Sequence, residues 1–263
     1  MSSRINKIFL DNTKKLITFV TGGDPNLETS KKIIHVVAKN GADLIEIGMP
    51  FSDPMADGPT IQLSSSRAIN NNINLDSIFS ICYEFRQTNQ HTPIILMGYY
   101  NVVFSYGISK FINACKKNGV DGLIIVDLQP EEDPELYKAL ELSDIDLIRL
   151  ITPTTNSERL KTILERSSGF LYYVTITGIT GQHSAEINEL NSSIKEIRTQ
   201  TSLPVVAGFG IKNAKQVEEI CQITDGAVVG SSIIKIIEDN LEDPNNLLNL
   251  IGNFVSNLKK GIN

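Results

Sequence analysis

The stretch "LIEIGMPFSDPMADGPTIQ" (residues 44–62) joins a short apolar run, a loop rich in Pro and Gly, and the start of a helix. Its first five residues are apolar apart from Glu46, as in strands that are buried on both faces. Pro59 suits the first turn of a helix, so a helix is predicted to begin there. The stretch therefore predicts one strand–loop–helix unit with a carboxyl group inside the strand.

Eight apolar runs are spaced along the 263 residues, too far apart for hairpins and suitably spaced for strand–helix pairs. They cover residues 16–20, 44–48, 93–97, 122–127, 146–151, 170–174, 203–210 and 226–230. The segments between them, such as residues 27–41, place apolar side chains on one stripe, as amphipathic helices do. This alternation predicts an α/β fold, a single (β/α)₈ TIM barrel over residues 1–263 with a short N-terminal helix. A doubly wound open sheet is the alternative.

The composition narrows the choice of partners and compartment. A net charge of −6 and a pI near 5.2 argue against a nucleic-acid or anionic-membrane partner, since both require a basic surface. No run approaches the length of a membrane span, and the N-terminal residues lack the apolar core of a signal peptide. Cys82, Cys115 and Cys221 are an odd number and far apart, as expected of buried thiols in a reducing compartment. We expect a cytoplasmic protein.

Glu46 is the most informative residue of the opening stretch. Strand alternation places Ile45 and Ile47 on one face and Leu44 and Glu46 on the other, which would face the barrel interior. A carboxyl group among apolar neighbours has a raised pKa, which suits a group that both donates and accepts a proton. The alternative is a buried ion pair, but only one of the eight runs carries a cation, Arg149.

Asp53 and Asp57 lie in the loop that leaves the same strand. In a TIM barrel the catalytic groups lie at the C-terminal ends of the strands and in the loops that follow them. A carboxylate in this loop could therefore join Glu46 as a general acid–base pair. The alternative is that each Asp is a turn residue that caps its own backbone, which is common in loops.

Three glycine-rich segments follow the last three strand runs. They are "GITGQ" (residues 178–182), "AGFGI" (residues 207–211) and "GSSII" (residues 230–234). Glycine lets backbone N–H groups approach an anion, and TIM barrels frequently bind phosphate at this position with a short extra helix. The segment that begins at Gly230 is predicted to form that helix. A single glycine would indicate only a tight turn, whereas three together predict a phosphate site.

Other kinds of catalysis lack the residues they need. No lysine stands at the end of a strand run, as a Schiff-base aldolase requires, and only His183 is placed at the upper rim. No metal-ligand cluster and no Gly-x-Gly-x-x-Gly nucleotide motif is found. What remains is cofactor-free acid–base chemistry on a small phosphorylated compound.

The segment "EIGMPFSDPMADGPTIQ" (residues 46–62) closely resembles the signature of the tryptophan synthase α-subunit family. Further blocks of that family follow in order at residues 19–25, 96–101, 119–132, 177–181, 208–211 and 230–238. The resemblance implies a lyase of tryptophan biosynthesis that cleaves indole-3-glycerol phosphate into indole and D-glyceraldehyde 3-phosphate. It also implies an αββα heterotetramer, in which the β subunit receives indole and carries pyridoxal phosphate. No cofactor is expected in this chain.

The resemblance also implies roles for particular residues. Glu46 matches the acid–base carboxylate, Asp57 the acceptor of the indole N–H, and Asp53 a position at the β-subunit interface. Tyr172 joins Glu46 and Asp57 in the expected catalytic set and also lines the indole pocket. The other expected substrate-binding residues are Phe19, Met97, Ile124, Thr180 and Phe209 around the indole, and Gly181, Gly210, Gly230 and Ser231 around the phosphate.

A few positions depart from the family pattern, namely Gln129, Thr175, Ile176 and Gln182. None of them removes a catalytic group. The last three lie next to the loop that is mobile in this family, so the sequence does not determine how fast that loop closes. Two other functions remain as alternatives. One is a mainly allosteric subunit of the β chain with weak activity, and the other is a phosphosugar isomerase barrel. The second alternative shares the phosphate site but lacks the Glu46 and Asp57 signature.

Overall fold

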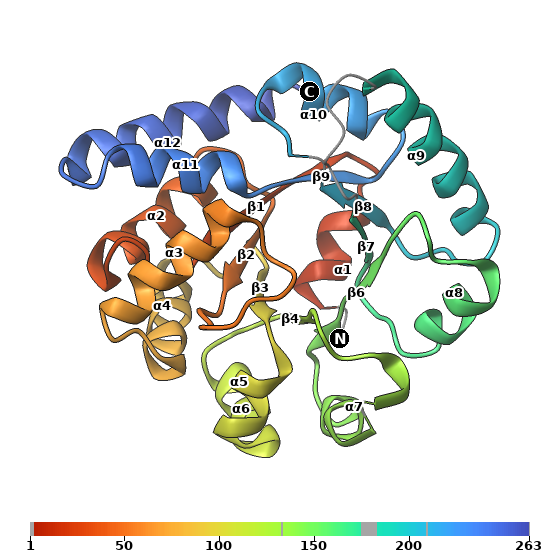
Figure 1. Cartoon of the computed structure of the whole chain (residues 1–263), viewed down its shortest axis with the longest axis horizontal. Helices are drawn as coiled ribbons and strands as arrows, with labels where there is room; N and C mark the ends of the chain where they lie inside the picture. The colour runs from red at the N-terminus through yellow and green to blue at the C-terminus, as the bar shows by residue number, and fades with distance from the viewer. Residues whose placement is uncertain (1–2, 133, 175–182, 209, 263) are drawn as a thin grey trace.

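A computed structural model describes residues 3–132, 134–174, 183–208 and 210–262, with the backbone alone at residues 183–186. The described strands are all parallel and form one sheet in the order β5-β4-β3-β2-β1-β9-β8-β7-β6, surrounded by helices (Figure 1). The strands are β1 (Lys15–Thr21), β2 (Leu44–Gly48), β3 (Ile94–Gly98), β4 (Gly122–Ile125), β5 (Asp146–Leu147), β6 (Arg149–Ile151), β7 (Leu171–Val174), β8 (Val205–Gly208) and β9 (Gly226–Val229).

The sheet closes into a barrel through β5 and β6, which stand at its two ends and follow each other in the chain. They are the two halves of the run predicted at residues 146–151, interrupted only at Ile148. The Ile148 N–H still donates to the Leu123 carbonyl of β4 over 2.9 Å, so the run stays paired across the interruption. Eight strand positions therefore form a closed ring. The predicted TIM barrel is confirmed, and the open doubly wound sheet is wrong.

The helices alternate with the strands as predicted. They are α1 (Arg4–Phe9), α2 (Leu27–Lys39), α3 (Pro59–Asn70), α4 (Leu75–Thr88), α5 (Tyr100–Tyr106), α6 (Ile108–Lys117), a 3₁₀ turn (Pro130–Glu132), α7 (Pro134–Glu141), α8 (Ser157–Leu164), α9 (His183–Arg198), α10 (Ala214–Cys221), α11 (Ser231–Asp239) and α12 (Pro244–Lys259). Asn26 caps α2 by accepting a hydrogen bond from the Thr29 N–H, and α2 buries Ile33, Ile34 and Val37 against the barrel. Among the described residues no helix is long and apolar enough to cross a membrane.

The strands separate two apolar cores. Leu44 and other inward side chains fill the barrel, whereas Ile45 and Ile47 belong to the larger core between the strands and the helices. The predicted alternation of β2 is thus observed. The inner core consists of Ile5, Ile17, Leu44, Ile95, Ile124, Ile148, Phe170, Val206 and Val228.

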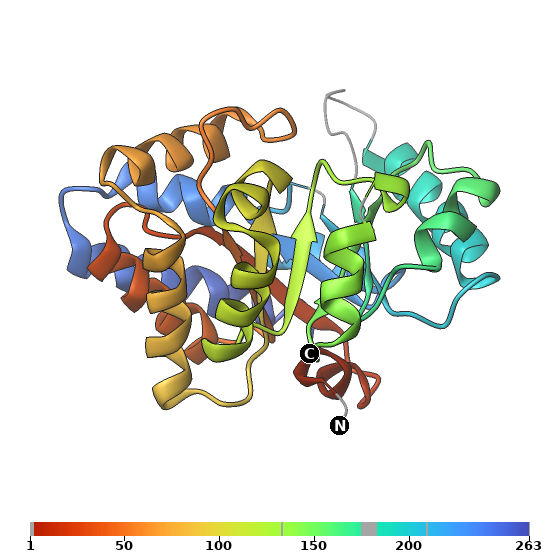
Figure 2. The same ribbon diagram turned by 90° about the horizontal axis from the view of Figure 1, so that it is seen from below.

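The N-terminal helix α1 closes one end of the barrel. Ile5 is fully buried in the inner core, and the Phe9 ring lies 5.8 Å from the Phe170 ring. A Cβ atom at Gly122 would come within 2.9 Å of Ile5, so the strand approaches the helix closely. Figure 2 shows α1 beneath the strands, at the end opposite the loop between β2 and α3. In the part of the chain that the structure describes, α1 therefore covers the N-terminal end of the barrel, and the C-terminal ends of the strands are left open.

Candidate active site

A cavity of about 500 Å³ lies at the open end of the barrel. Its volume is typical of a site for a small molecule. Eight of the residues predicted to form the site line it: Phe19, Glu46, Asp57, Met97, Tyr172, Gly210, Gly230 and Ser231. They come from strands and loops spread around the ring, and the barrel brings them to one mouth.

The other predicted site residues are placed differently. Ile124 is fully buried in the inner core below the cavity, and Val126, two residues further along the chain, lines the cavity instead. Asp53 is exposed on the loop outside the cavity. Thr180, Gly181 and Phe209 lie outside the described residues, as do Thr175, Ile176 and Gln182.

Glu46 lies in the wall of the cavity with its side chain fully buried. It pairs in register with Phe19 of β1 and Ile95 of β3, so apolar side chains flank it. Within the described part of the chain neither carboxyl oxygen has a hydrogen-bond partner. Burial raises the pKa of Glu46 to about 8, because the charged form loses its hydration. The carboxyl group is therefore protonated at neutral pH and can donate a proton.

Tyr172 of β7 lines the same cavity as Glu46. Burial, and then the nearby charge of Glu46, raise the pKa of Tyr172 well above its ordinary value, so the phenol stays neutral. A Cβ atom at Gly208 would lie 2.5 Å from the Tyr172 hydroxyl oxygen, so glycine at that position leaves room for the phenol. Tyr172 thus offers a neutral hydroxyl group and an aromatic ring to a ligand beside Glu46.

Asp57 lies on the loop between β2 and α3 and is half-buried. Burial raises the pKa of Asp57, and a hydrogen bond from the Tyr99 hydroxyl opposes this shift. The Tyr99 hydroxyl oxygen also accepts from the Ala56 N–H over 3.0 Å, and its ring stacks on Phe51 with 5.3 Å between centroids. Tyr99 therefore anchors the loop that carries Asp57.

Tyr99 was not singled out in the sequence, although it directly follows β3. Its position immediately after a strand is the signal that could have identified it, because catalytic groups of TIM barrels lie there. Met49, Ile61 and Ser65 also line the cavity and were not predicted.

The N-terminus of α11 forms another part of the cavity wall, with Gly230 as its N-cap and Ser231 as its first residue. Gly230 has no side chain to cap the helix, so the first N–H groups of α11 are available to a ligand. The Ser232 hydroxyl donates to the Ile211 carbonyl over 2.6 Å and ties α11 to the loop after β8, where Gly210 also lines the cavity. Such a terminus favours an anion. This part of the cavity is suited to a phosphate group.

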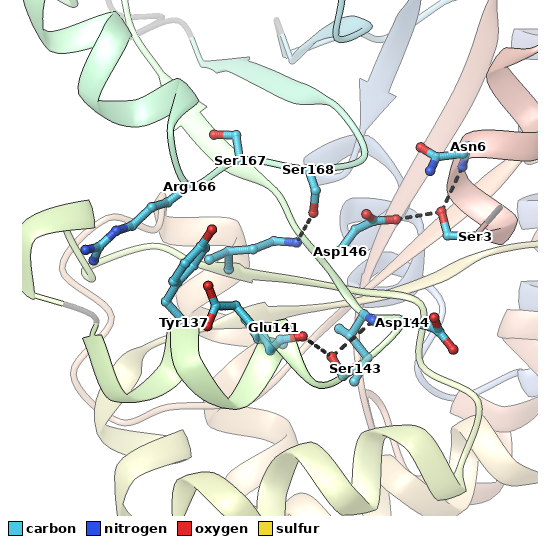
Figure 3. A pocket seen from close by; sticks show the side chains of 13 residues that line it. Ser3, Asn6, Tyr137, Glu141, Ser143, Asp144, Asp146, Arg166, Ser167 and Ser168 are labelled. Atoms are coloured by element: carbon cyan, nitrogen blue, oxygen red, sulfur yellow. Dashed lines mark hydrogen bonds between the residues drawn. The ribbon is translucent and has the colours of Figure 1, made fainter. Parts of the chain in front are cut away.

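A second cavity, of about 310 Å³, lies at the opposite end of the barrel between α1, α7 and β5 (Figure 3). Asp146 accepts a hydrogen bond from the Ser3 hydroxyl over 2.7 Å, and Ser168 accepts from the Leu147 N–H over 2.9 Å. Arg166 lies over the Tyr137 ring at 5.1 Å. These polar groups bind one another, at the barrel face whose residues serve stability. The cavity at the open end is therefore the candidate active site.

Across residues 3–132, 134–174, 183–208 and 210–262, no cluster of three or more His, Cys, Asp or Glu side chains could hold a metal ion. The described part of the site offers two carboxyl groups, two phenols and a helix N-terminus. Together with the closed barrel, these groups define a TIM-barrel enzyme that binds an anionic ligand and transfers protons.

Comparison with known proteins identifies the family. Residues 6–263 match the family model described as tryptophan synthase alpha chain. The tryptophan synthase alpha chains of Geobacter sp. (strain M21) and Geotalea uraniireducens are each 45% identical to this chain. The first alignment covers 100% of this chain and 97% of the relative, and the second covers 95% and 93%. The chain belongs to the tryptophan synthase alpha chain family.

Solved structures agree with this assignment. Tryptophan synthase subunit alpha from Legionella pneumophila superposes with a TM-score of 0.92 at 34% identity, covering 100% of this chain and 99% of that one. A chain of tryptophan synthase from M. tuberculosis gives 0.88 at 26% identity, covering 99% and 98%. The chain is therefore a carbon–carbon lyase of tryptophan biosynthesis, and its reaction is the cleavage of indole-3-glycerol phosphate.

Proposed function

We propose that this chain cleaves indole-3-glycerol phosphate with Glu46 as the proton-transfer group and Asp57 as the acceptor of the indole N–H. The observation that carries this proposal is the state of Glu46. It is a fully buried carboxyl group in the cavity wall, with a pKa raised to about 8 and no hydrogen-bond partner among the described residues. Such a group holds a proton at neutral pH and has an unoccupied oxygen with which to reach a substrate.

The first step is protonation of the indole ring. The protonated Glu46 carboxyl group donates its proton to C3 of the indole, which leaves positive charge on the ring and its N–H. Asp57, across the mouth, accepts a hydrogen bond from that N–H and stabilises the charge. Phe19, Met97 and Tyr172 supply the apolar and aromatic surface that holds the ring.

The second step breaks the carbon–carbon bond. The bonding electrons return to the indole ring, and the hydroxyl carbon of the side chain becomes the aldehyde of glyceraldehyde 3-phosphate. The carboxylate of Glu46 takes the hydroxyl proton, so the group ends the cycle protonated as it began. One carboxyl group with a pKa near neutrality serves both proton transfers, which is the property expected of a group that alternates between acid and base.

The phosphate group of the substrate would bind at the N-terminus of α11. Gly230 and Ser231 present backbone N–H groups, and Gly210 lies on the neighbouring loop. Gly181, together with Thr180 and Phe209 on the indole side, completes the set expected from the family resemblance. These assignments orient the substrate with its phosphate at α11 and its ring between Glu46 and Asp57.

The partner of this chain would be the β subunit of tryptophan synthase, in an αββα heterotetramer. Met55, beside the cavity, is 82% exposed, and Phe104 of α5 is 63% exposed, so large apolar side chains face solvent after β2 and β3. Such side chains suit a protein interface. Asp53, exposed on the same loop as Met55, would face the β subunit. Pyridoxal phosphate would belong to that partner and no cofactor to this chain, and the complex would work in the cytoplasm.

An indole-release assay on indole-3-glycerol phosphate, with and without the β subunit, tests this function. We expect slow release by the chain alone and faster release in the complex, because closure of loops over the site completes it. No indole under either condition would remove the proposal. Activation of the β subunit without any turnover by this chain would favour the alternative of an allosteric subunit.

A further inference from the structure

The helix that follows Asp57 buries mainly small side chains. α3 begins at Pro59, two residues after Asp57, and its fully buried side chains are Ser64, Ser65 and Ala68. Small and hydroxylated side chains bury little apolar area, and the larger Ile61 of α3 packs against the outer core while only partly buried. The position of Asp57 consequently depends on the polar contacts that fix α3 to the barrel.

The strongest of these contacts is the ion pair of Arg67 with Asp24. The Arg67 Nε atom lies 2.8 Å from Asp24 Oδ1, and its Nη2 atom lies 2.9 Å from Asp24 Oδ2. This two-point geometry fixes orientation as well as distance. Asp24 is only 1% exposed, and burial raises its pKa although Arg67 opposes the shift. Loss of Arg67 would leave Asp24 buried without its counter-ion.

Asp24 stands on a firmly held turn at the end of β1. The Gly22 N–H donates to the Gly48 carbonyl of β2 over 2.9 Å, and the Gly23 N–H donates to the Ser30 hydroxyl over 2.9 Å. One strand residue adds a contact to α3, since the Thr21 and Ser64 hydroxyls lie 2.5 Å apart. The turn thus provides a fixed base from which Asp24 holds α3.

The same ion pair lies close to a second helix of the site, α11. α11, whose N-terminus carries Ser231, packs against α3. Glu238 of α11 acts electrostatically on both Asp24 and Arg67. Arg67 therefore lies where α3, which follows Asp57, approaches the C-terminal part of α11, which begins at Ser231.

We propose that Asp24 and Arg67 are positioning residues, which hold α3 so that Asp57 keeps its place in the wall of the cavity that Glu46 also lines. The inference rests on the proposed role of Asp57 in the cleavage of indole-3-glycerol phosphate. Misplacement of a catalytic group by about 1 Å can lower a rate by roughly 100-fold, so a two-point anchor behind Asp57 has a direct effect on turnover.

The test is a double-mutant cycle on indole release. Arg67→Lys and Asp24→Asn are each measured alone and combined with Asp57→Asn, with kcat and KM determined separately. We expect each single variant to lower kcat/KM by about 10- to 100-fold. In the Asp57→Asn background, the same changes should lower kcat/KM by less than about 2-fold, because the effects of residues that act through one group are not additive.

Arg86→Lys is the control, because Arg86 also forms an ion pair with a buried carboxylate, Asp121, at 2.6 Å, but near the N-terminal ends of β3 and β4. We expect it to lower Tm without changing kcat/KM. Equal losses for Arg67→Lys in both backgrounds, or a lower Tm with unchanged kcat/KM, would overturn the inference. Full activity of Asp57→Asn alone would instead remove the proposed role of Asp57. Arg67→Lys keeps the positive charge beside Asp24, so this variant still tests the inference if Asp24→Asn does not fold.

Discussion

Glu46 combines a catalytic property with a cost in stability. Its carboxyl group is fully buried, and its pKa rises from 4.5 to about 8 in the folded chain. Ionisation is therefore easier in the unfolded chain than in the folded one. The raised pKa of Glu46 thus supplies a proton at neutral pH, and it also destabilises the fold as the pH rises.

Glu46→Gln should lower indole formation by about 100-fold or more, because the amide cannot transfer a proton. Binding of indole-3-glycerol phosphate should persist, since the apolar and phosphate contacts remain. Steady-state indole release and equilibrium binding of the substrate measure the two effects separately. Near-normal turnover in this variant would refute the role of Glu46.

The same variant should be more stable than the parent chain above about pH 5, by a margin that grows with pH. Between pH 4.5 and pH 8 the folded parent keeps the Glu46 proton and the unfolded parent loses it, so the parent loses stability as the pH rises. Gln does not titrate. Denaturant unfolding at pH 5 and pH 7 should show the advantage of the variant increasing by about 1–3 kcal/mol. A constant difference would mean that Glu46 is not held in its neutral form.

At the residue scale, sequence reasoning succeeded where the strand period governs a side chain. Alternation along β2 placed Glu46 inward, and the structure has it there. The depth of Ile124 in the barrel depends on the stagger of neighbouring strands, which no single run encodes. The contact of Tyr99 with the Asp57 loop depends on the course of an irregular loop. Periodicity carries no information about such a course.

At the element scale, the sequence predicted the alternation of strands and helices but not every boundary. The run at residues 146–151 has no Gly or Pro to mark the interruption at Ile148, which arises where the run changes neighbours between β4 and β7. A short N-terminal helix was predicted, but its place across the end of the barrel was not. That place is decided by tertiary contacts of Ile5 and Phe9 with the inner core.

Ile5→Ala should lower the stability of the barrel by about 2–5 kcal/mol, because it removes a fully buried side chain and leaves a void in the inner core. The kcat of the folded enzyme should stay unchanged, since Ile5 lies at the end of the barrel away from the active site. Thermal unfolding and indole release measure the two quantities. Leu10→Ala is the control, because Leu10 is 73% exposed at the end of the same helix and should change stability by less than about 0.5 kcal/mol.

At the scale of the whole molecule, the choice of substrate and partner depends more on the groups at the mouth of the barrel than on the net charge. The charge of −6 argues against a nucleic-acid or anionic-membrane partner, but it does not exclude a small anionic substrate, because the positive dipole of α11 acts locally. Composition could not locate the exposed Met55 and Phe104, since their exposure is a property of the folded surface.

Asp53→Asn should leave indole release by the isolated chain within about 2-fold of the parent, because Asp53 is exposed and lies outside the cavity. The acceleration by the β subunit should fall, since a charge at the proposed interface is lost. Titration of the β subunit against indole release measures both quantities. An unchanged response to the β subunit would remove Asp53 from the interface.

The closed end formed by α1 determines the route of the product. Ile5 and Phe9 pack into the inner core below the active site, so the described residues leave indole no exit along the barrel axis. It must leave by the same mouth through which its precursor arrives. Whatever covers that mouth therefore decides whether the volatile, membrane-permeable product escapes into the medium or is handed on. Product retention in this enzyme thus depends on residues 4–9 as well as on any partner at the mouth.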